Sequence, residues 1–501
     1  MKFLTAVTIS LCLLAPATAS EKRRLRQGEN NYGVGVGSGQ DGHPGKGLGQ
    51  KPGFLDGEDL PPGLVDNPSG AVGVKFKPGR KPKVQRNPNW ANGKSKLLGI
   101  DNNVIDLDLD AAQPINVFAP EQFKESEDGK FVTNIETGEI IPLTVFFLSD
   151  EKKGMDIKFA TDEDGNIFNV RAKPKIRDEE DEAIEAKIQN FQTIPGTNML
   201  AAYTDDDVDL SDAPSFGDIP TSTLEKPLPP SFTQKLNGVD GGGRTRALYG
   251  SDLEQTKKSD KMEVENPRDK SRRTQASYSV TLFGRTCTSW DWLDVRIATD
   301  QLFAATYSNH QSRAQAIFAE AAEIYWNESC VRLYMWSYGH TVGNTDYTLD
   351  IPIFWTTISL PWDSYANGLP SGCTADYGGL DLLKALGQQN FAGAYRDAFH
   401  MFTGINFTDG STVGCAWIDA CKSEEWGYGV NDMTWTTSLR FQGVEFAHEL
   451  GHNLGLGHNS CTSPFRWVMC PSINSAVWDL HPTDASNVRS DVVDSSSCGW
   501  Y

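Results

Sequence analysis

The order of apolar and polar residues changes several times along the chain, and the first segment is apolar. Lys2 precedes an apolar run over residues 3–14, and small residues follow at 17–19. A charged start, an apolar centre and a small-residue cleavage site are typical of a secretory signal peptide. The run is too short to span a bilayer as a stable helix. We therefore predict that residues 1–19 are a signal peptide, with an uncleaved anchor as the alternative, and that the protein is secreted and extracellular.

The next two segments differ sharply in their patterns. Residues 20–97 are rich in Gly, Pro, Asn and Lys, and such a composition buries too little apolar area to offset chain entropy, so we predict a low-complexity, mostly disordered segment. In residues 98–224, Ile105 and Leu107 alternate with Asp106 and Asp108, which is the period of a half-buried strand. Turn-forming pairs separate short apolar runs at 128–129, 137–138 and 164–165. Residues 98–224 are therefore predicted to be a β-rich pro-domain.

Residues 225–273 return to a linker composition with Pro, Gly and many charges. The segment ends in the basic pair Arg272 and Arg273, which resembles a site cut by subtilisin-like proprotein convertases and would make Thr274 the new N-terminus. A simple charged linker is the alternative. If the site is used, a processing protease is a partner of this protein.

From residue 274 to 501 the pattern indicates a globular α+β domain. Apolar residues recur at helical spacing over 314–325, and Val331, Leu333 and Met335 alternate as in a strand. Two more helices are predicted over 380–400 and 444–454, and a short strand over 413–418. No later stretch reaches about 18 consecutive apolar residues, so no membrane-spanning helix is expected.

Composition narrows the classes of function. The 501 residues carry 46 Lys+Arg against 66 Asp+Glu, a net charge of −20. Phosphate recognition needs a basic surface, so this balance argues against a nucleic-acid binder. Eight of the nine Cys lie after residue 274, and the exception is Cys12. In an oxidising compartment these eight most simply form four disulfides.

The segment 448–458 reads HELGHNLGLGH. His448 and His452 are four residues apart, so on a helix they share one face and can reach one metal ion. Gly455 lets the helix end in a left-handed conformation, which can bring His458 round as a third ligand. Three imidazoles and a water form the open arrangement of catalytic zinc, Zn2+. A pair of His on a polar helix face is the alternative, and the extended spacing argues against it.

This segment resembles the metzincin metalloproteases, and most closely their reprolysin (adamalysin/ADAM-like) branch. The sequences at 396–404 and 414–416 resemble that branch's helix before a Thr-Gly turn and its edge strand. The resemblance implies an α+β catalytic domain, with a mixed twisted sheet and helices, whose two lobes enclose a zinc cleft. It also implies a methionine turn beneath the metal, for which Met469 is the candidate, although an ordinary core Met would look the same in sequence.

The chain departs from the family pattern at three positions. Asn459 stands where reprolysins usually have an Asp that anchors the C-terminal subdomain. Cys470 follows Met469 instead of preceding it, and Pro471 stands where astacins and serralysins have Tyr. The family resemblance pairs Cys421 with Cys498, and proximity in sequence suggests a second pair, Cys461 with Cys470.

The resemblance implies a zinc metalloendopeptidase that acts on extracellular protein and peptide substrates. Glu449 would be the general base that activates a zinc-bound water for attack on the peptide carbon. The strand over 413–418 would pair with an extended substrate. A secreted binding or adhesion protein with a vestigial protease fold is the alternative. A third hypothesis makes the N-terminal half an independent cell-wall or matrix-binding module.

The enzyme would be made as a zymogen. Residues 21–273 contain no Cys, so a pro-region thiol cannot occupy the zinc. Two hypotheses remain, namely that Asp218 binds the zinc, or that the pro-region blocks the cleft sterically. Asn327 and Asn406 lie in glycosylation sequons. The remaining histidines are predicted to be surface or structural residues, namely His310, His340, His400 and His481.

Overall fold

The computed structural model describes eighteen stretches of the chain: residues 55, 73–88, 94–108, 110–135, 137–175, 188–195, 197–211, 215–220, 279–342, 346–349, 380, 383, 397–407, 412–418, 427–459, 461, 467–472 and 479–493. The chain divides into two units, Met1–Lys51 and Pro52–Tyr501, and every described residue belongs to the second. The predicted signal peptide lies outside the described residues, and so do Arg272, Arg273, Cys421 and Cys498. No helix in the described stretches combines the length and apolarity needed to cross a bilayer.

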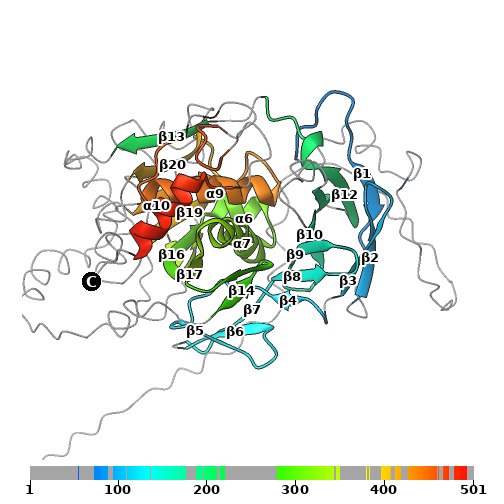
Figure 1. Ribbon diagram of the computed structural model, residues 1–501, viewed down its shortest axis with the longest axis horizontal. Coiled ribbons are helices and arrows are strands. Elements are labelled where there is room, and N and C mark those ends of the chain that lie inside the picture. Colours follow the sequence, from blue (N-terminus) through cyan, green and yellow to red (C-terminus); the bar gives the residue numbers. More distant parts are fainter. Residues whose placement is uncertain are drawn as a thin grey trace, which may run out of the picture. The chain divides into compact units, whose positions relative to one another are not determined.

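An antiparallel seven-stranded sheet forms the core of the N-terminal region (Figure 1). Tight hairpins connect several of its neighbouring strands, and Gly165, with a φ of 80°, makes one of these turns. We call this sheet the N-terminal sheet. In spatial order its strands are β1 (Lys83–Arg86), β12 (Met199–Thr204), β11 (Gln189–Thr193), β10 (Ile167–Pro174), β9 (Met155–Thr161), β8 (Val145–Asp150) and β4 (Gln113–Pro114).

Two smaller sheets accompany it. One pairs β2 (Lys94–Leu98) with β3 (Val104–Asp108), and the other holds β5 (Phe123–Glu125), β6 (Phe131–Asn134) and β7 (Ile140–Pro142). The hairpins predicted at 128–129, 137–138 and 164–165 are confirmed by these pairings. The prediction for residues 20–97 was wrong at its C-terminal end, because β1 and β2 lie there. Val84 is buried in the core, so even a sparse apolar pattern can complete a sheet.

A mixed seven-stranded sheet forms the C-terminal domain. Four of the six neighbouring pairs of strands in this sheet are parallel, and two are antiparallel. In order the strands are β13 (Ser215–Pro220), β20 (Thr412–Ile418), β21 (Tyr428–Asp432), β19 (Ala398–Thr403), β16 (Asp291–Thr299), β17 (Val331–Val342) and β18 (Asp346–Leu349). Together with its helices this sheet gives the α+β architecture that the sequence predicts.

Helices pack on this sheet and on one another. They are α6 (Gln301–Thr306), α7 (His310–Ser329), α9 (Leu439–Asn453) and α10 (Pro482–Val493), and a 3-10 turn, η4 (Asp205–Asp207), follows β12. Helix α7 supports α9 directly, because the Tyr325 hydroxyl donates to the Ala447 carbonyl at 2.9 Å and Phe318 packs on Phe446. The helices predicted over 314–325 and 444–454 are therefore present, and both begin earlier than predicted.

The helix predicted over 380–400 was partly wrong. Leu380 and Leu383 are helical, but Ala398, Phe399 and His400 lie in strand β19. All six residues of β19 are buried at the middle of the mixed sheet. A fully buried strand shows a continuous apolar run that its periodicity does not distinguish from a buried helix.

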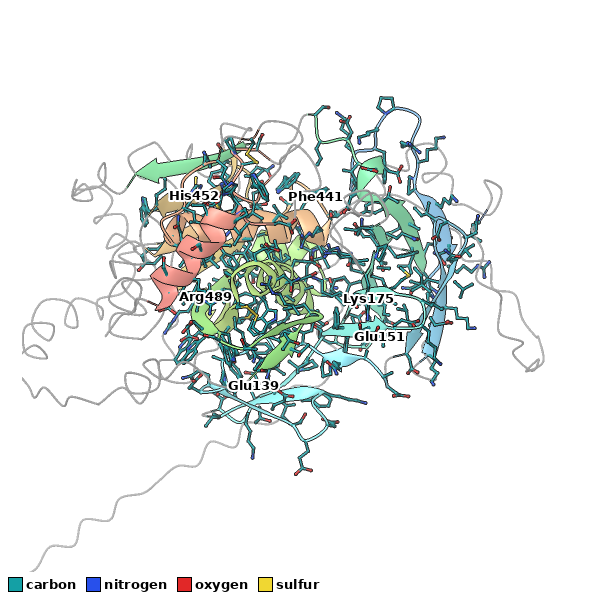
Figure 2. All side chains as sticks on the ribbon, in the orientation of Figure 1. Glu139, Glu151, Lys175, Phe441, His452 and Arg489 are labelled. Atoms are coloured by element: carbon teal, nitrogen blue, oxygen red, sulfur yellow. A yellow bond between two sulfur atoms is a disulfide. The ribbon has the colours of Figure 1, made fainter. Side chains whose placement is uncertain are left out.

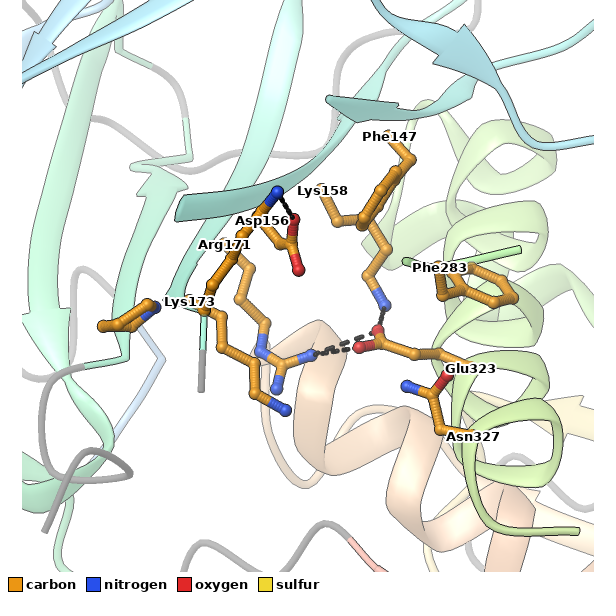
Figure 3. A pocket seen from close by; sticks show the side chains of 10 residues that line it. Phe147, Asp156, Lys158, Arg171, Lys173, Phe283, Glu323 and Asn327 are labelled. Atoms are coloured by element: carbon orange, nitrogen blue, oxygen red, sulfur yellow. Dashed lines mark hydrogen bonds and ion pairs between the residues drawn. The ribbon is translucent and has the colours of Figure 1, made fainter. Parts of the chain in front are cut away.

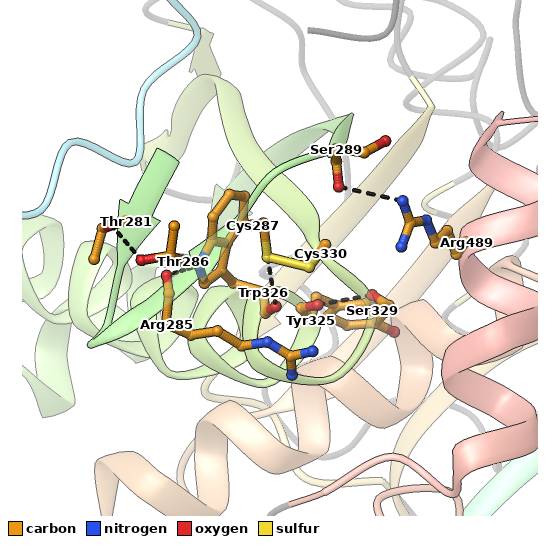
Figure 4. Close-up of a disulfide and its surroundings, with 10 residues drawn as sticks. All are labelled: Thr281, Arg285, Thr286, Cys287, Ser289, Tyr325, Trp326, Ser329, Cys330 and Arg489. Carbon is orange, nitrogen blue, oxygen red and sulfur yellow. Dashed lines mark hydrogen bonds between the residues drawn. A yellow bond between two sulfur atoms is a disulfide. The ribbon is translucent and has the colours of Figure 1, made fainter. Parts of the chain in front are cut away.

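A disulfide closes the C-terminal end of α7 (Figure 4). It joins Cys287, at the end of β15 (Arg285–Cys287), to Cys330, the left-handed cap residue of the helix. Strand β15 pairs with β14 (Val280–Leu282). The Trp326 indole donates to the Arg285 carbonyl at 3.0 Å, so the first described strands of the C-terminal domain are fixed to α7.

One face of the N-terminal sheet shares an apolar core with the C-terminal domain, and the opposite face packs with β2 and β3 in a second core. Backbone pairing continues across the boundary, since the Met335 N–H donates to the Val117 carbonyl at 2.6 Å and the Ala119 N–H donates to the Met335 carbonyl at 3.2 Å. The side chain of Gln192 also donates to Thr437 at 2.6 Å. The N-terminal region is thus built into the C-terminal domain by both backbone and side-chain contacts.

Five charged side chains lie at this boundary, four of them buried and one, Glu323, half-buried, and we call them the interface ion cluster. Lys158 and Arg171 of the N-terminal sheet face Glu323 of α7 (Figure 3). Glu320 of α7 pairs with Lys158, and Arg440 of α9 completes the cluster. The Lys158 ammonium lies 2.8 Å from Glu320, Arg171 lies 3.2 Å from Glu323, and Arg440 lies 3.3 Å from Glu320. Every carboxylate of the cluster therefore has a cation within ion-pairing distance.

Candidate metal centre

Helix α9 carries the first half of the HELGHNLGLGH segment, and the turn after it carries the second. His448 and His452 follow one another on the same face of α9, and the helix ends at Asn453. Gly455 then adopts a φ of 85°, in the left-handed region that favours glycine. The chain reverses there and returns His458 toward the helix. Figure 2 labels His452 near the C-terminal end of α9 and Phe441 near its N-terminal end.

The three imidazoles converge as the spacing predicts. One nitrogen from each of His448, His452 and His458 lies within 4.8 Å of the others, and the Nε2 atoms of His448 and His458 are 3.1 Å apart. We call these residues the histidine cluster. No other group of three such ligands is found in the described stretches of the chain.

Backbone carbonyls fix the tautomer of two of these rings. Nδ1 of His448 lies 2.7 Å from the Val468 carbonyl, and Nδ1 of His452 lies 2.7 Å from the Leu456 carbonyl. A carbonyl oxygen only accepts, so each Nδ1 carries the proton, and the lone pair lies on Nε2. This arrangement orients Nε2 as a ligand atom and makes it more basic.

Burial keeps the rings neutral. Loss of solvation, followed by the neighbouring His452, holds the pKa of His448 well below 6.5. A neutral imidazole is the form that binds a metal ion. Two buried rings with anchored Nδ1 atoms and a third brought in by the turn match the three-nitrogen donor set of an open zinc site. The residues present therefore fit Zn2+.

Met469 packs directly beneath the ligand helix. It is fully buried, and its Sδ lies against Gly451, where an added Cβ would approach the sulfur to 2.5 Å. The adjacent Val468 carbonyl is the partner of His448, and the Met469 carbonyl accepts from the Asn459 N–H at 2.8 Å. The segment around Met469 thus supports both the helix and the turn that carries His458.

Asn459 connects the histidine cluster to the C-terminal helix. Its side-chain amide donates to Asp484 of α10 at 2.6 Å. The family pattern assigns an anchoring role to an Asp at this position, and here the amide of Asn459 provides the anchor with the carboxylate on the opposite partner. Cys461 and Cys470 form a disulfide, as proximity in sequence suggested, which joins this turn to the Met469 segment.

A buried polar network that the sequence analysis did not foresee holds the end of α9. The Asn453 amide donates to the Trp417 carbonyl at 3.0 Å and to the Tyr428 carbonyl at 3.2 Å, and its Oδ1 lies 3.0 Å from Nε2 of His400. Burial lowers the pKa of His400 to about 3, so this ring is a neutral structural residue. The network ties the residue next to His452 to β19, β20 and β21.

Two of the remaining histidines also have structural contacts. Nδ1 of His310 lies 2.7 Å from the Tyr338 hydroxyl, and His481 packs against the ring of Trp467. The side chain of His340 lies outside the described residues.

Strand β13 covers the outer edge of β20. The two strands run parallel, with Phe216 opposite Gly414 and Asp218 opposite Ala416 (Figure 1). This places a segment of the predicted pro-domain on the strand that was expected to receive substrate. The side chains of β13 lie outside the described residues, so the suggested Asp218 contact with a metal is untested.

Comparison with known proteins agrees with this geometry. Residues 291–486 match the family model Reprolysin_5, described as metallo-peptidase family M12. Two curated relatives are the zinc metalloproteinase-disintegrin-like proteins brevilysin H2a and brevilysin H2b of Gloydius brevicauda. Each is 32% identical over 96 residues, which cover 18% of this chain and 22% of the relative. Residues 291–486 therefore match a family M12 metallopeptidase domain, and the two relatives support the reprolysin branch, as the resemblance predicted.

Proposed function

We propose that this protein is a secreted, zinc-dependent metalloendopeptidase, made as a zymogen, that hydrolyses peptide bonds of extracellular proteins. The main support is the histidine cluster, in which backbone carbonyls set the tautomer of His448 and His452 so that Nε2 of each is the ligand atom. A helix face that was merely polar would have no need for two anchored rings and a third returned by a glycine turn.

The residues of the site divide the chemistry among them. His448, His452 and His458 hold the zinc ion, which when bound polarises the scissile carbonyl and lowers the pKa of a water molecule. Glu449 accepts the proton of the attacking water and passes it to the leaving amine. The carboxylate of Glu449 is buried beside the ligand His448, where a charge acts more strongly on its neighbours than in bulk water.

The edge of β20 is the binding site for an extended substrate in this proposal. A peptide added there as a strand would gain main-chain hydrogen bonds, as in other cases of β-addition. Strand β13 pairs with that same edge. A substrate and the pro-domain segment 215–220 would therefore compete, which supports steric blocking of the cleft as the source of latency.

The relation of the N-terminal region to the catalytic domain also favours a pro-domain. One face of its sheet packs into the same core cluster as α7 and α9, and the other face packs with β2 and β3 in a second cluster. The shared core, the backbone pairing at Met335 and the interface ion cluster join the region to the catalytic domain, as expected of a pro-domain. Cleavage after Arg273 is the proposed first step of activation, because it would separate β13 from the catalytic chain.

The test compares Glu449→Gln with the unaltered protein after processing. We expect the variant to keep one zinc per chain by metal analysis and to lose casein digestion, because the amide cannot accept a proton. The digestion by the unaltered protein should stop on chelation. A zinc-loaded, processed protein that digests no casein would instead support the binding protein with a vestigial protease fold.

A further inference from the structure

Gly414 of β20 faces the proposed general base. The strand passes α9 so closely that a Cβ built on Gly414 would lie 2.3 Å from Oε1 of Glu449, 2.8 Å from its Cδ and 2.9 Å from its Cγ. Real Cβ atoms essentially never approach another heavy atom within 3.0 Å. The carboxylate of Glu449 therefore occupies the space in which any side chain at position 414 would begin.

Backbone conformation does not explain this glycine. The described glycines with positive φ are eight in number, and Gly414 is not among them. A glycine inside a strand weakens it, because it has more conformational freedom to lose and no side chain to pack. In strands, glycine often marks a position at which another group approaches closely. Here that group is the Glu449 carboxylate.

We propose that Gly414 is a positioning residue for Glu449, because its missing side chain seats the carboxylate against the strand that receives the substrate. The inference rests on the proposed function, and it adds a constraint that the zinc motif does not contain. The general base is set by two elements at once, namely the helix that carries it and the strand backbone that leaves room for it.

The elements on both sides of the contact are fixed. On its inner side β20 pairs with β21, with Gly414 opposite Asn431. Helix α9 is held to β20 by the Asn453 amide on the Trp417 carbonyl, and to α7 by the Tyr325 hydroxyl on the Ala447 carbonyl. Neither backbone can easily retreat, so an added methyl group must be accommodated by the torsions of the Glu449 side chain.

This fixes the consequence of adding one carbon atom. In Gly414→Ala the carboxylate leaves its seat while the imidazoles stay in place, since His448 and His452 are anchored elsewhere, through the Val468 and Leu456 carbonyls. Zinc binding should therefore survive, and proton transfer should not. General acid–base catalysis contributes about 10²–10⁴-fold, and misplacing the base forfeits most of it.

The first experiment uses the full chain after processing. We expect Gly414→Ala to keep one zinc per chain and to lose on the order of 10²-fold in kcat, with KM changed only a few-fold. The matched control is Ala305→Ser, because it also adds one heavy atom but at an exposed position of α6 in the same domain. The control should keep the activity of the unaltered protein.

A second pair of variants separates positioning from general damage. Glu449→Asp shortens the side chain by one methylene, so its carboxylate can lie beside an alanine at 414. The loss in kcat of Gly414→Ala combined with Glu449→Asp should be clearly smaller than the product of the two single losses. If Gly414→Ala unfolds or loses zinc, Glu449→Ala should restore the melting temperature and the metal content, because it removes the clashing atoms.

Several results would overturn the inference. One is an activity of Gly414→Ala equal to that of the control. Another is a double variant, Gly414→Ala with Glu449→Asp, whose loss in kcat equals the product of the two single losses. Failure of Glu449→Ala to rescue a damaged Gly414→Ala variant would have the same meaning. The proposed function has a separate failure: the unaltered, zinc-loaded protein would then cleave no peptide, whatever residue 414 is.

Discussion

Two sets of ionisable side chains, most of them buried, include residues of the neighbouring helices α7 and α9, and they reach opposite electrostatic states. In the interface ion cluster, burial alone would raise the pKa of Glu323, but Lys158 and Arg171 more than offset it, so the pKa is lowered and the carboxylate stays ionised. In the histidine cluster, burial and two neighbouring imidazoles lower the pKa of His448 and keep the ring neutral. The charges of the interface ion cluster are paired with one another within the protein. The nitrogen lone pairs of the histidine cluster are oriented to bind a cation.

The comparison shows how buried ionisable groups with a structural role differ from those arranged to bind a ligand. Charges removed from water are stable when opposite charges and hydrogen bonds replace the solvent, and such a set is structural. Imidazole rings that are held through Nδ1 and whose other nitrogens converge are arranged to bind a metal ion. Burial therefore accompanies a structural role at Glu320 and, in the proposed function, a metal-ligand role at His452.

The largest expected effect comes from removing a member of the histidine cluster. His452→Ala should abolish zinc binding and reduce casein digestion to background. It should also lower the melting temperature, because an ion that binds only the folded state stabilises it by mass action. Metal analysis and calorimetry with and without added zinc measure this. A zinc-dependent shift in melting temperature that survived the substitution would contradict the assignment of His452 as a ligand.

Breaking the interface ion cluster should have a smaller effect. It should lower the free energy of unfolding and leave zinc binding unchanged. Lys158→Met removes the cation next to Glu320 and Glu323, and breaking a buried ion pair from one side typically costs about 3 kcal/mol. Denaturant unfolding of the unprocessed chain measures it. The matched control is Lys94→Met, whose pair with Asp108 is exposed and whose midpoint should not change. Equal midpoints for the two variants would mean that the cluster is not stabilising.

The third prediction concerns pH. The pKa values of Glu320 and Glu323 are lowered in the folded state, because nearby cations offset the effect of burial. Their stabilisation is therefore complete above the unfolded pKa of about 4.3 and is lost as pH falls toward the folded values. The stability difference between the unaltered protein and Lys158→Met should shrink from pH 7 to pH 3.

Asp205 titrates with the opposite sign, since burial raises its pKa to about 6. It is present in both proteins, so comparing them at each pH largely removes its contribution. A stability difference that stayed constant down to pH 3 would show that the two glutamates are not the groups that matter.

The smallest expected effect comes from the hydrogen bond between Asn459, which follows His458, and Asp484 of α10. Asn459→Ala removes the donor to Asp484, and losing one hydrogen bond of this kind should cost about 1–2 kcal/mol. Asn459→Asp is the sharper companion variant, because it places two carboxylates side by side and should be worse than alanine at pH 7. The order of the two unfolding midpoints tests whether the amide is the anchoring group.

Local features of the fold and site could be predicted from the sequence, and long-range ones could not. The positions of His448, His452 and the turn at Gly455 follow from helical spacing and from glycine's conformational freedom, both of which act within a few residues. The hairpins of the N-terminal region were predictable for the same reason. Strand β19 was mistaken for helix because full burial removes the alternation that marks a strand.

The contacts that the sequence did not reveal join residues far apart in the chain. Asn453 meets His400 across 53 positions, and Lys158 meets Glu323 across 165. The sequence around each of these residues gives no sign of its partner. The order of the strands and the packing of the helices bring the partners together. Gly414 belongs to this class too, because its meaning appears only when Glu449 arrives from another element.

The disulfide at the end of α7 has a consequence for when the protein matures. It closes a loop with a sequence separation of 43, a constraint on the unfolded chain that corresponds to about 4 kcal/mol. The helix it secures is the one on which the metal helix rests, through Tyr325 and Ala447. Newly made chains held among reducing thiols would lack this disulfide, so assembly of the α7–α9 scaffold is tied to an oxidising environment.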